Sequence, residues 1–199
     1  MNSTHKGHVE YTRNEYTDSV YYQSVIAHLK NAKITSSVDV GACVGEVTKM
    51  LMESIPTLTR CLMIEPIKDN IAFLLKRFTD KRITVLPFAM YYGASEIKIG
   101  KIDNVGGASV FIIETPDKTE KCKTITLEAI KTPIDFVKID VEGSEMNIIE
   151  NSTQLKEIKF IEIEFHHYDM GLDKIGYVKK WLPNHKILLE KVNSLFLSL

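Results

Sequence analysis

A glycine turn between a short apolar strand and a helix is the first feature of this sequence that can do chemistry. The segment reads Val38-Asp39-Val40-Gly41-Ala42-Cys43-Val44-Gly45. Gly41 permits a sharp turn and a close approach of the backbone to a ligand. The free N–H groups at the start of the following helix favour a polar or anionic group. The turn therefore predicts a binding site for a nucleotide-like cofactor.

A carboxylate follows the next apolar strand. The strand is Cys61-Leu62-Met63-Ile64, and Glu65 stands at its carboxyl end. Dinucleotide-binding folds place an acid roughly 20 residues beyond the glycines, where it accepts hydrogen bonds from ribose hydroxyls. The turn alone could serve only for packing, with Asp39 as its cap. The turn and Glu65 together predict an adenosine pocket.

The spacing of the glycines disfavours a dinucleotide. The dinucleotide fingerprint is G-x-G-x-x-G, which seats a pyrophosphate on the helix, whereas this turn reads G-x-x-x-G and follows Asp39. A fixed negative charge suits S-adenosylmethionine (SAM) better, because SAM carries a sulfonium and an amino group and no phosphate. The predicted cofactor-binding residues come from the turn, from the ends of the next two strands and from a later strand: Asp39, Gly41, Ala42, Cys43, Gly45, Glu65, Pro66, Phe88, Ala89, Asp140 and Glu142.

A second group of candidate residues follows two later strands. Asp140 and Glu142 end one apolar segment, and Glu164 and His166 end the next. Because ligands bind beyond the carboxyl ends of strands in open parallel sheets, all four side chains can face one crevice. We predict His166 as a catalytic general base, since imidazole titrates near neutrality, and Asp140 and Glu164 as further catalytic residues. Asp140 could instead cap the following helix, and Glu142 could hold its turn through backbone N–H groups.

Two further interpretations concern the same strands. Lys138 lies inside a buried segment, which predicts a structural ion pair with Glu162, Glu164 or Asp140. Asp140, Glu164 and His166 also form a candidate oxygen-rich site for a divalent metal. No ligand spacing in the sequence requires a metal.

Strands and helices alternate along most of the chain. A helical stripe over 17–31 opens it, and short apolar segments then alternate with helices. Two closing strands, 186–192 and 195–199, form a hairpin. The pattern predicts one α/β domain over residues 1–199, with a seven-stranded, mostly parallel sheet, an antiparallel last strand and helices on both faces. This arrangement suits the Rossmann-like sheet of class I methyltransferases.

Two parts of the chain depart from this alternation. Residues 1–33 are interpreted as an N-terminal extension and a helix. Residues 94–130 contain two short alternating segments around the glycine-containing loop 104–109. We interpret 94–130 as an antiparallel insertion with a flexible glycine hinge, and thus as a candidate lid over the pocket. An ordinary surface hairpin is the alternative.

The composition limits the classes of partner. The chain has 199 residues and a net charge of −1, which fits one domain and gives no electrostatic case for nucleic acid or membrane binding. Cys43, Cys61 and Cys122 lack C-x-x-C spacing, which argues against a disulfide framework or a zinc ribbon. No run of 18 apolar residues and no secretory signal is present. We therefore expect a cytoplasmic protein.

The segment Asp135–Ile149 indicates a family. It reads D-F-V-K-I-D-V-E-G-S-E-M-N-I-I, and with V-D-V-G-A-C-V-G, I-E-P and I-E-I-E-F-H it closely resembles the FkbM family of SAM-dependent methyltransferases. The resemblance covers roughly residues 36–170 and implies a class I methyltransferase fold. It implies methyl transfer, typically to a hydroxyl oxygen of a sugar, polyketide or other small metabolite. It also assigns the cofactor turn and the ribose acid to Asp39, Gly41, Ala42, Gly45 and Glu65.

These observations predict a SAM-dependent methyltransferase that acts on a hydroxyl of a small-molecule or glycan acceptor. The family commonly has asparagine where this chain has Cys43. That departure and the short chain leave open a binding or scaffold protein on a degenerate methyltransferase fold. The missing third glycine disfavours a nicotinamide-dependent oxidoreductase, and the absence of an N/D-P-P-Y motif disfavours nucleic-acid methylation. The sequence does not specify the acceptor or the oligomeric state.

Overall fold

A computed structural model describes residues 20–101, 108–109, 119–166 and 173–199. The elements follow in this order: α1 (Val20–Asn31), β1 (Ser36–Val40), α2 (Glu46–Ser54), β2 (Arg60–Ile64), α3 (Lys68–Arg77), β3 (Ile83–Leu86), β4 (Ala89–Met90), β5 (Glu96–Lys101), β6 (Ala108–Ser109), β7 (Thr119–Ile125), the 3-10 helix η2 (Leu127–Ala129), β8 (Phe136–Ile139), α4 (Glu145–Asn151), the 3-10 helix η3 (Gln154–Glu157), β9 (Phe160–Glu164), α5 (Lys174–Trp181), β10 (Lys186–Glu190) and β11 (Ser194–Ser198).

A seven-stranded sheet forms the centre, with the strand order β10-β11-β9-β8-β1-β2-β3. Neighbouring strands from β9 to β3 are parallel, whereas β11 is antiparallel to both β9 and β10. The predicted fold class, including the antiparallel last strand, is confirmed. The chain runs from β1 through β2 to β3 at one edge and later continues at β8, on the other side of β1, so the switch point of the sheet lies between β1 and β8. A ligand crevice is expected beyond the carboxyl ends of these two strands.

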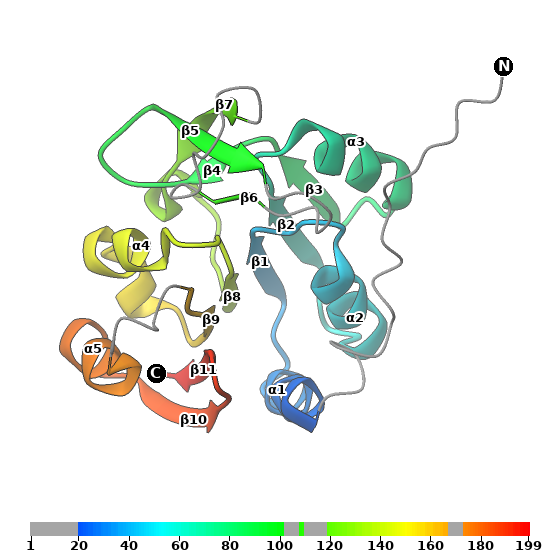
Figure 1. Cartoon of the computed structure of the whole chain (residues 1–199). Coiled ribbons are helices and arrows are strands. Elements are labelled where there is room, and N and C mark those ends of the chain that lie inside the picture. Colours follow the sequence, from blue (N-terminus) through cyan, green and yellow to red (C-terminus); the bar gives the residue numbers. More distant parts are fainter. Residues whose placement is uncertain (1–19, 102–107, 110–118, 167–172) are drawn as a thin grey trace, which may run out of the picture.

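Helices cover both faces of the sheet (Figure 1). α1, α2 and α3 lie on one side, and α4 and α5 lie on the other. Alternate residues of a strand point to opposite faces: Val38 and Val40 of β1 belong to the cluster that packs under α4 and α5, together with Ile139 of β8. Phe136 packs on the other face, with α1 and α2. Both faces of the sheet are therefore buried, as is usual for parallel strands.

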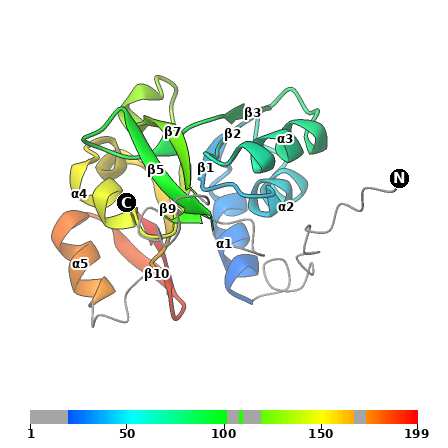
Figure 2. The ribbon, with the colours of Figure 1, turned by 45° about the horizontal axis from the view of Figure 1, so that its top comes forward.

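The strands of the insertion, β5, β6 and β7, form a second, four-stranded sheet with β4, in the order β4-β7-β5-β6. β5 and β7 pair antiparallel, as the sequence predicts. This sheet lies across the carboxyl ends of the central strands (Figure 2). Ile67, Ala89, Ile99 and Cys122 form its small core. Movement of the insertion as a lid stays a prediction, and residues 104–107 of its proposed hinge lie outside the described residues, as do residues 1–19 of the predicted N-terminal extension.

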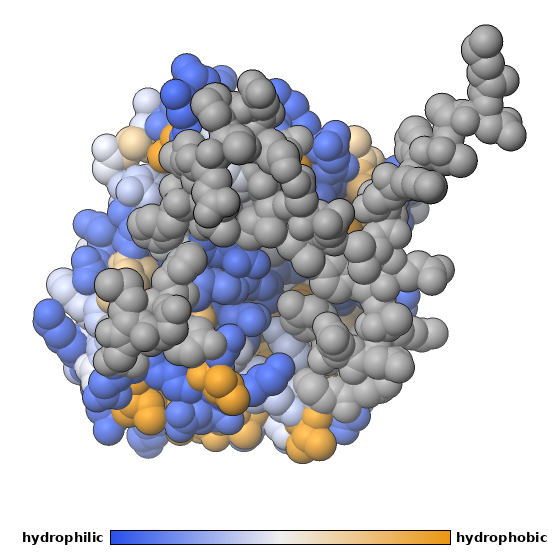
Figure 3. Space-filling view, in the orientation of Figure 1, coloured by the Kyte–Doolittle hydropathy of each residue, from blue (hydrophilic) through white to orange (hydrophobic). Residues whose placement is uncertain are grey.

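The surface seen in Figure 3 is largely hydrophilic, with hydrophobic residues scattered along its lower rim. The most exposed large apolar side chains of the described residues include Val20, Leu75 and Val192, which are far apart in the sequence. Scattered apolar residues of this kind are usual for a protein surface. Within the described ranges, no helix is long and apolar enough to span a bilayer.

A row of charged residues crosses the three central strands. Asp39, Lys138 and Glu162 are neighbours in the ladder of β1, β8 and β9, and each is at most 3% exposed. Nζ of Lys138 lies 2.9 Å from Oδ2 of Asp140 and 3.8 Å from Oδ1 of Asp39. The predicted ion pair with Asp140 is therefore confirmed, and Asp39 is a second partner that the prediction did not include.

Burial and charge act in opposite directions on this row. Burial acts to lower the pKa of Lys138, but the carboxylates of Asp140 and Asp39 outweigh it and raise the pKa, so the ammonium stays charged. Burial raises the pKa of Glu162 to about 8, against the opposing effect of Lys138. At neutral pH, Glu162 is therefore largely protonated, and the ammonium group of Lys138 is left with two carboxylate partners, Asp140 and Asp39.

We predict that K138M destabilises the protein strongly, because it leaves Asp39 and Asp140 without a counter-charge. Breaking a buried ion pair from one side costs about 3–5 kcal/mol of unfolding free energy. Urea unfolding followed by circular dichroism measures the loss. Exposed Lys156 of η3 provides the control, since K156M should change stability by about 0.5 kcal/mol or less. Equal stability of the two variants would show that the row does not hold the sheet together.

Candidate functional site

The turn after β1 approaches the turn after β8 because Gly41 has no side chain. Its φ is +77°, and a Cβ built there would lie 1.7 Å from the carbonyl oxygen of Asp140. The N–H groups of Gly41 and Ala42 both donate to the carbonyl of Ile64. Gly41 therefore joins the ends of β1, β2 and β8 at one point.

Glu65 holds the glycine turn from the end of β2. Its Oε2 accepts a hydrogen bond from the N–H of Cys43 at 2.8 Å, and its Oε1 accepts from the N–H of Ile67 and from Asn70. Cys43 has a φ of +49°, a strained conformation for a residue with a side chain. Burial raises the pKa of Glu65 to about 7, although the three hydrogen bonds act to lower it. Oε2 accepts this one hydrogen bond from the described residues and has capacity for a further donor.

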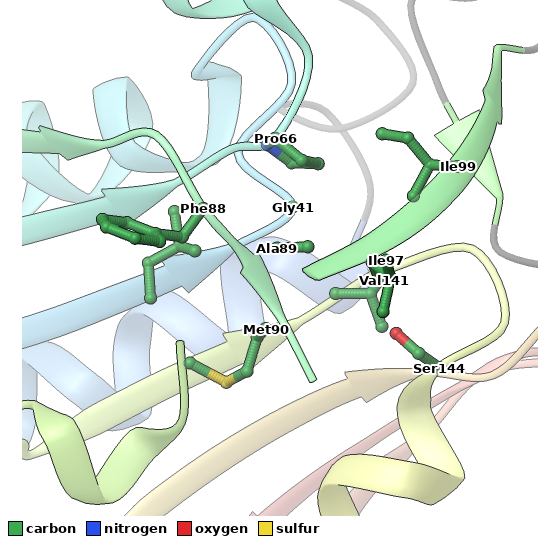
Figure 4. A pocket seen from close by; sticks show the side chains of 10 residues that line it. Gly41, Pro66, Phe88, Ala89, Met90, Ile97, Ile99, Val141 and Ser144 are labelled. Atoms are coloured by element: carbon green, nitrogen blue, oxygen red, sulfur yellow. The ribbon is translucent and has the colours of Figure 1, made fainter. Parts of the chain in front are cut away.

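A pocket lies beside this turn and under the insertion (Figure 4). It encloses about 340 Å³ of space, part of it open to solvent. The predicted cofactor residues Gly41, Pro66, Phe88 and Ala89 line it, together with residues that the sequence prediction missed: Ile64, Met90, Ile97, Ile99, Val141 and Ser144. Figure 4 shows Ile97 and Ile99 reaching in from β5. The lining is mostly apolar, as in most small-molecule sites.

The other predicted cofactor residues of the turn, Ala42, Cys43 and Gly45, do not line the pocket. Ala42 packs against Met63 and Leu74. Gly45 precedes α2 with a φ of +82°, and a Cβ there would lie 2.5 Å from the ring of Phe78. Together with Cys43, these residues shape the turn and are not among the residues that line the pocket.

Asp39 has a different place from the one predicted. It is 2% exposed, its Oδ2 accepts a hydrogen bond from Thr48 at 2.8 Å, and its Oδ1 faces Lys138. Its negative charge is therefore compensated inside the protein and is not offered to a cationic cofactor. The physical reason is strand alternation, which turns Asp39 toward the same face as Lys138.

Of the four residues predicted to follow β8 and β9 into the crevice, Asp140, Glu142 and His166 come together. Nε2 of His166 lies 3.3 Å from Oε2 of Glu142 and 3.7 Å from Oδ1 of Asp140. Nδ1 of His166 lies 2.7 Å from Oε1 of Glu145. Asp140 does not cap α4, because Ser144 occupies the N-cap position and Asp140 pairs with Lys138. Asp140 and Glu142, which follow β8, thus form one cluster with His166, which follows β9.

The charges around His166 control its protonation. Burial alone would lower the pKa of His166, but the hydrogen bond and charge of Glu145, with the charges of Glu142 and Asp140, raise it to about 9. Burial raises the pKa of Glu142. At neutral pH His166 is therefore largely an imidazolium, whereas the sequence prediction took an imidazole that titrates near neutrality.

Glu164 lies beside this cluster and is not part of it. The side-chain atoms that converge within 4.8 Å of one another belong to Asp140, Glu142 and His166, so the predicted divalent site of Asp140, Glu164 and His166 is not assembled. Asp140, Glu142 and His166 are instead the group whose ligand atoms lie close enough to share one ion. Burial and the charge of Asp140 raise the pKa of Glu164.

Sequence reasoning missed Glu145. The sequence offered Glu142 as a residue that could hold the β8–α4 turn, but Glu145 accepts the hydrogen bonds from the N–H groups of Gly143 and Val141, at 3.1 and 3.4 Å. The available signal for Glu145 was its position: it stands in the first turn of a helix, where an acid is stabilised, shortly after the two acids that follow β8.

Strand order and pocket position define a Rossmann-like class I methyltransferase fold. The family model named Methyltransferase FkbM domain matches residues 39–190. Because this match covers more than half of the chain, the protein belongs to the FkbM family of SAM-dependent methyltransferases, and the resemblance seen in the sequence is confirmed. A comparison with curated proteins finds no match.

Solved structures share this fold. Methyltransferase FkbM from Methylobacillus flagellatus KT superposes with a TM-score of 0.59 at 22% identity, over 84% of this chain and 44% of that one. The present chain thus spans less than half the length of that protein. A protein of the NADB-Rossmann superfamily from Streptococcus agalactiae has a TM-score of 0.51 at 15% identity, over 90% of this chain and 68% of the other. The methyltransferase domain of bacterial CtHen1 has a TM-score of 0.52 at 9% identity, over 89% and 96%.

We predict that G41A disrupts the junction of β1 and β8. Gly93 provides a matched control, because its φ is +93° and an added Cβ meets nothing within 4 Å. G93A should cost about 1–2 kcal/mol for the left-handed backbone, and G41A roughly 1–3 kcal/mol more, from overpacking against Asp140. Urea unfolding of both variants measures the difference. Equal losses would mean that contact with Asp140 does not constrain the turn.

Proposed function

We propose that the protein transfers the methyl group of SAM to a hydroxyl oxygen of a small molecule or glycan. The observation that carries the proposal is the junction at Gly41, where an apolar pocket of adenosine type meets the cluster of Asp140, Glu142 and His166. Val141 and Ser144 line the pocket. Val141 stands between Asp140 and Glu142 in the sequence, and Ser144 stands two residues after Glu142. A methyl donor in the pocket and an acceptor at His166 would then be neighbours.

The residues around the pocket fit the adenosine part of SAM. Phe88, Ala89 and Ile99 offer apolar surface for a purine ring. Glu65 stands at the end of β2, next to Pro66 of the pocket wall, with capacity at Oε2 for a ribose hydroxyl. Gly41 adds only backbone to the lining of this pocket.

SAM, when bound, supplies an activated methyl group on a positively charged sulfur. In that reaction the acceptor oxygen would bond to the methyl carbon, and sulfur would keep the electron pair of the broken carbon–sulfur bond. Nε2 of His166 takes the hydroxyl proton. Asp140 and Glu142 stabilise the imidazolium that results, and Lys138 holds Asp140 in place. Alignment of the oxygen with the methyl group contributes much of the rate.

The cofactor is tested by calorimetric titration with S-adenosylhomocysteine (SAH). We predict that E65Q weakens SAH binding by about 10- to 100-fold, the value of one to two hydrogen bonds to a charged group. Because the pKa of Glu65 is about 7, the wild-type affinity should fall as the pH drops from 8 to 6 and the carboxylate takes up a proton. E65Q should lose this dependence.

Exposed Glu53 of α2 gives the control, since E53Q should bind SAH like the wild type. Folded wild-type protein that binds no SAH at millimolar concentration would exclude the proposed cofactor.

The reaction is tested with radiolabelled SAM and a panel of glycans and hydroxylated metabolites. Only neutral imidazole accepts a proton, and with a pKa of about 9 about 1% of His166 is neutral at pH 7. We predict that the methylation rate rises with pH and levels off at or below pH 9, since a bound cation lowers the pKa of His166.

H166N should lose this pH dependence and about 10²- to 10⁴-fold in rate, while its SAH affinity stays near that of the wild type. SAH binding without methylation of any acceptor would instead favour a binding protein on this fold.

A further inference from the structure

The one buried carboxylate that contacts both the β8–α4 turn and His166 belongs to Glu145, among the described residues around the cluster. Glu145 is the first residue of α4 and is 2% exposed. A single oxygen, Oε1, is 2.7 Å from Nδ1 of His166, 3.1 Å from the N–H of Gly143 and 3.4 Å from the N–H of Val141. A negative charge at the first turn of a helix is also stabilised by the free N–H groups there.

We propose that Glu145 is the positioning residue of this site: it fixes the proton of neutral His166 on Nδ1 and directs Nε2 toward the acceptor. This proposal rests on the proposed function, in which Nε2 takes the hydroxyl proton. An imidazole that donates from Nδ1 has its unshared electron pair on Nε2. A buried carboxylate on Nδ1 sets that tautomer and orients the ring in the same way as the third group of a catalytic triad.

Through the same oxygen, Glu145 also holds the β8–α4 turn, which carries Glu142 on the other side of the imidazole. Glu142 and Gly143 have φ values of +53° and +117°, so the turn that carries Glu142 has a backbone conformation that side chains disfavour. The hydrogen bonds from Val141 and Gly143 to Oε1 stabilise it. One oxygen thus sets both the direction of the imidazole and the place of the carboxylate that faces its Nε2.

A purely structural Glu145 would hold the turn without influence on the imidazole proton. The two roles are separated by nuclear magnetic resonance of protein labelled with ¹⁵N-histidine, with His166 assigned by its loss in H166N. In the wild type above pH 9, we expect His166 to carry its proton on Nδ1. We expect a strongly downfield N–H proton there, because a carboxylate is a stronger acceptor than an amide.

E145Q and E145L are the test variants, and E150Q is the control from the same helix. Exposed Glu150 accepts a hydrogen bond from Tyr177 and does not contact His166. E145L should shift neutral His166 toward the Nε2-protonated tautomer. E145Q keeps an acceptor for the turn, and should move the Nδ1 proton upfield. E150Q should leave both signals unchanged.

Where an acceptor has been identified, E145Q should lower kcat by about 10²-fold, as expected for a misplaced catalytic group, with SAH affinity within about twofold of the wild type. An unchanged tautomer in E145L overturns the proposal, as does an unchanged Nδ1 proton in E145Q. Should E145L not fold, the E145Q signal decides alone. Failure of the wild type to bind SAH would overturn the proposed function and leave the tautomer result standing.

Discussion

The ammonium group of Lys138 joins the two halves of the site. It lies between Asp140 and Asp39 inside the central sheet, where an uncompensated charge would be strongly unfavourable. The carboxyl ends of β1 and β8 are therefore constrained to stay together. The turn at Gly41 can then pass against the carbonyl of Asp140. This contact brings the apolar pocket next to the cluster of His166.

Much of this arrangement could be predicted from the sequence. The fold followed from apolar segments that alternate with helical stripes, since burial on both faces leaves a strong pattern in parallel strands. Gly41, Pro66, Phe88 and Ala89 line the pocket, because strand ends in a parallel sheet meet at one edge. The same rule brought Asp140, Glu142 and His166 together from two separate strands.

The remaining features depend on contacts that spacing does not encode. Asp39 stands directly before the glycine turn, yet it pairs with Lys138 of another strand, and only the register of β1 on β8 decides this. Ile97 and Ile99 reach the pocket from an insertion whose packing has no local signal. The high pKa of His166 needs three carboxylates that come from one turn and one helix, and sequence reasoning assigned no role to Glu145.

On the proposed function, the carboxylates around His166 also balance the charges of the reaction. For each methyl group gained, the acceptor loses one proton, and the sulfonium loses its positive charge. If Nε2 of His166 receives that proton, the site holds one positive charge before the reaction and one after it. Asp140, Glu142 and Glu145 then stabilise both states. The imidazole must start neutral, and the nearby sulfonium favours this form because two positive charges repel each other. The carboxylates make His166 a strong base and so favour its protonated form. The cationic donor is therefore needed to drive off that proton before the imidazole can accept one from the acceptor.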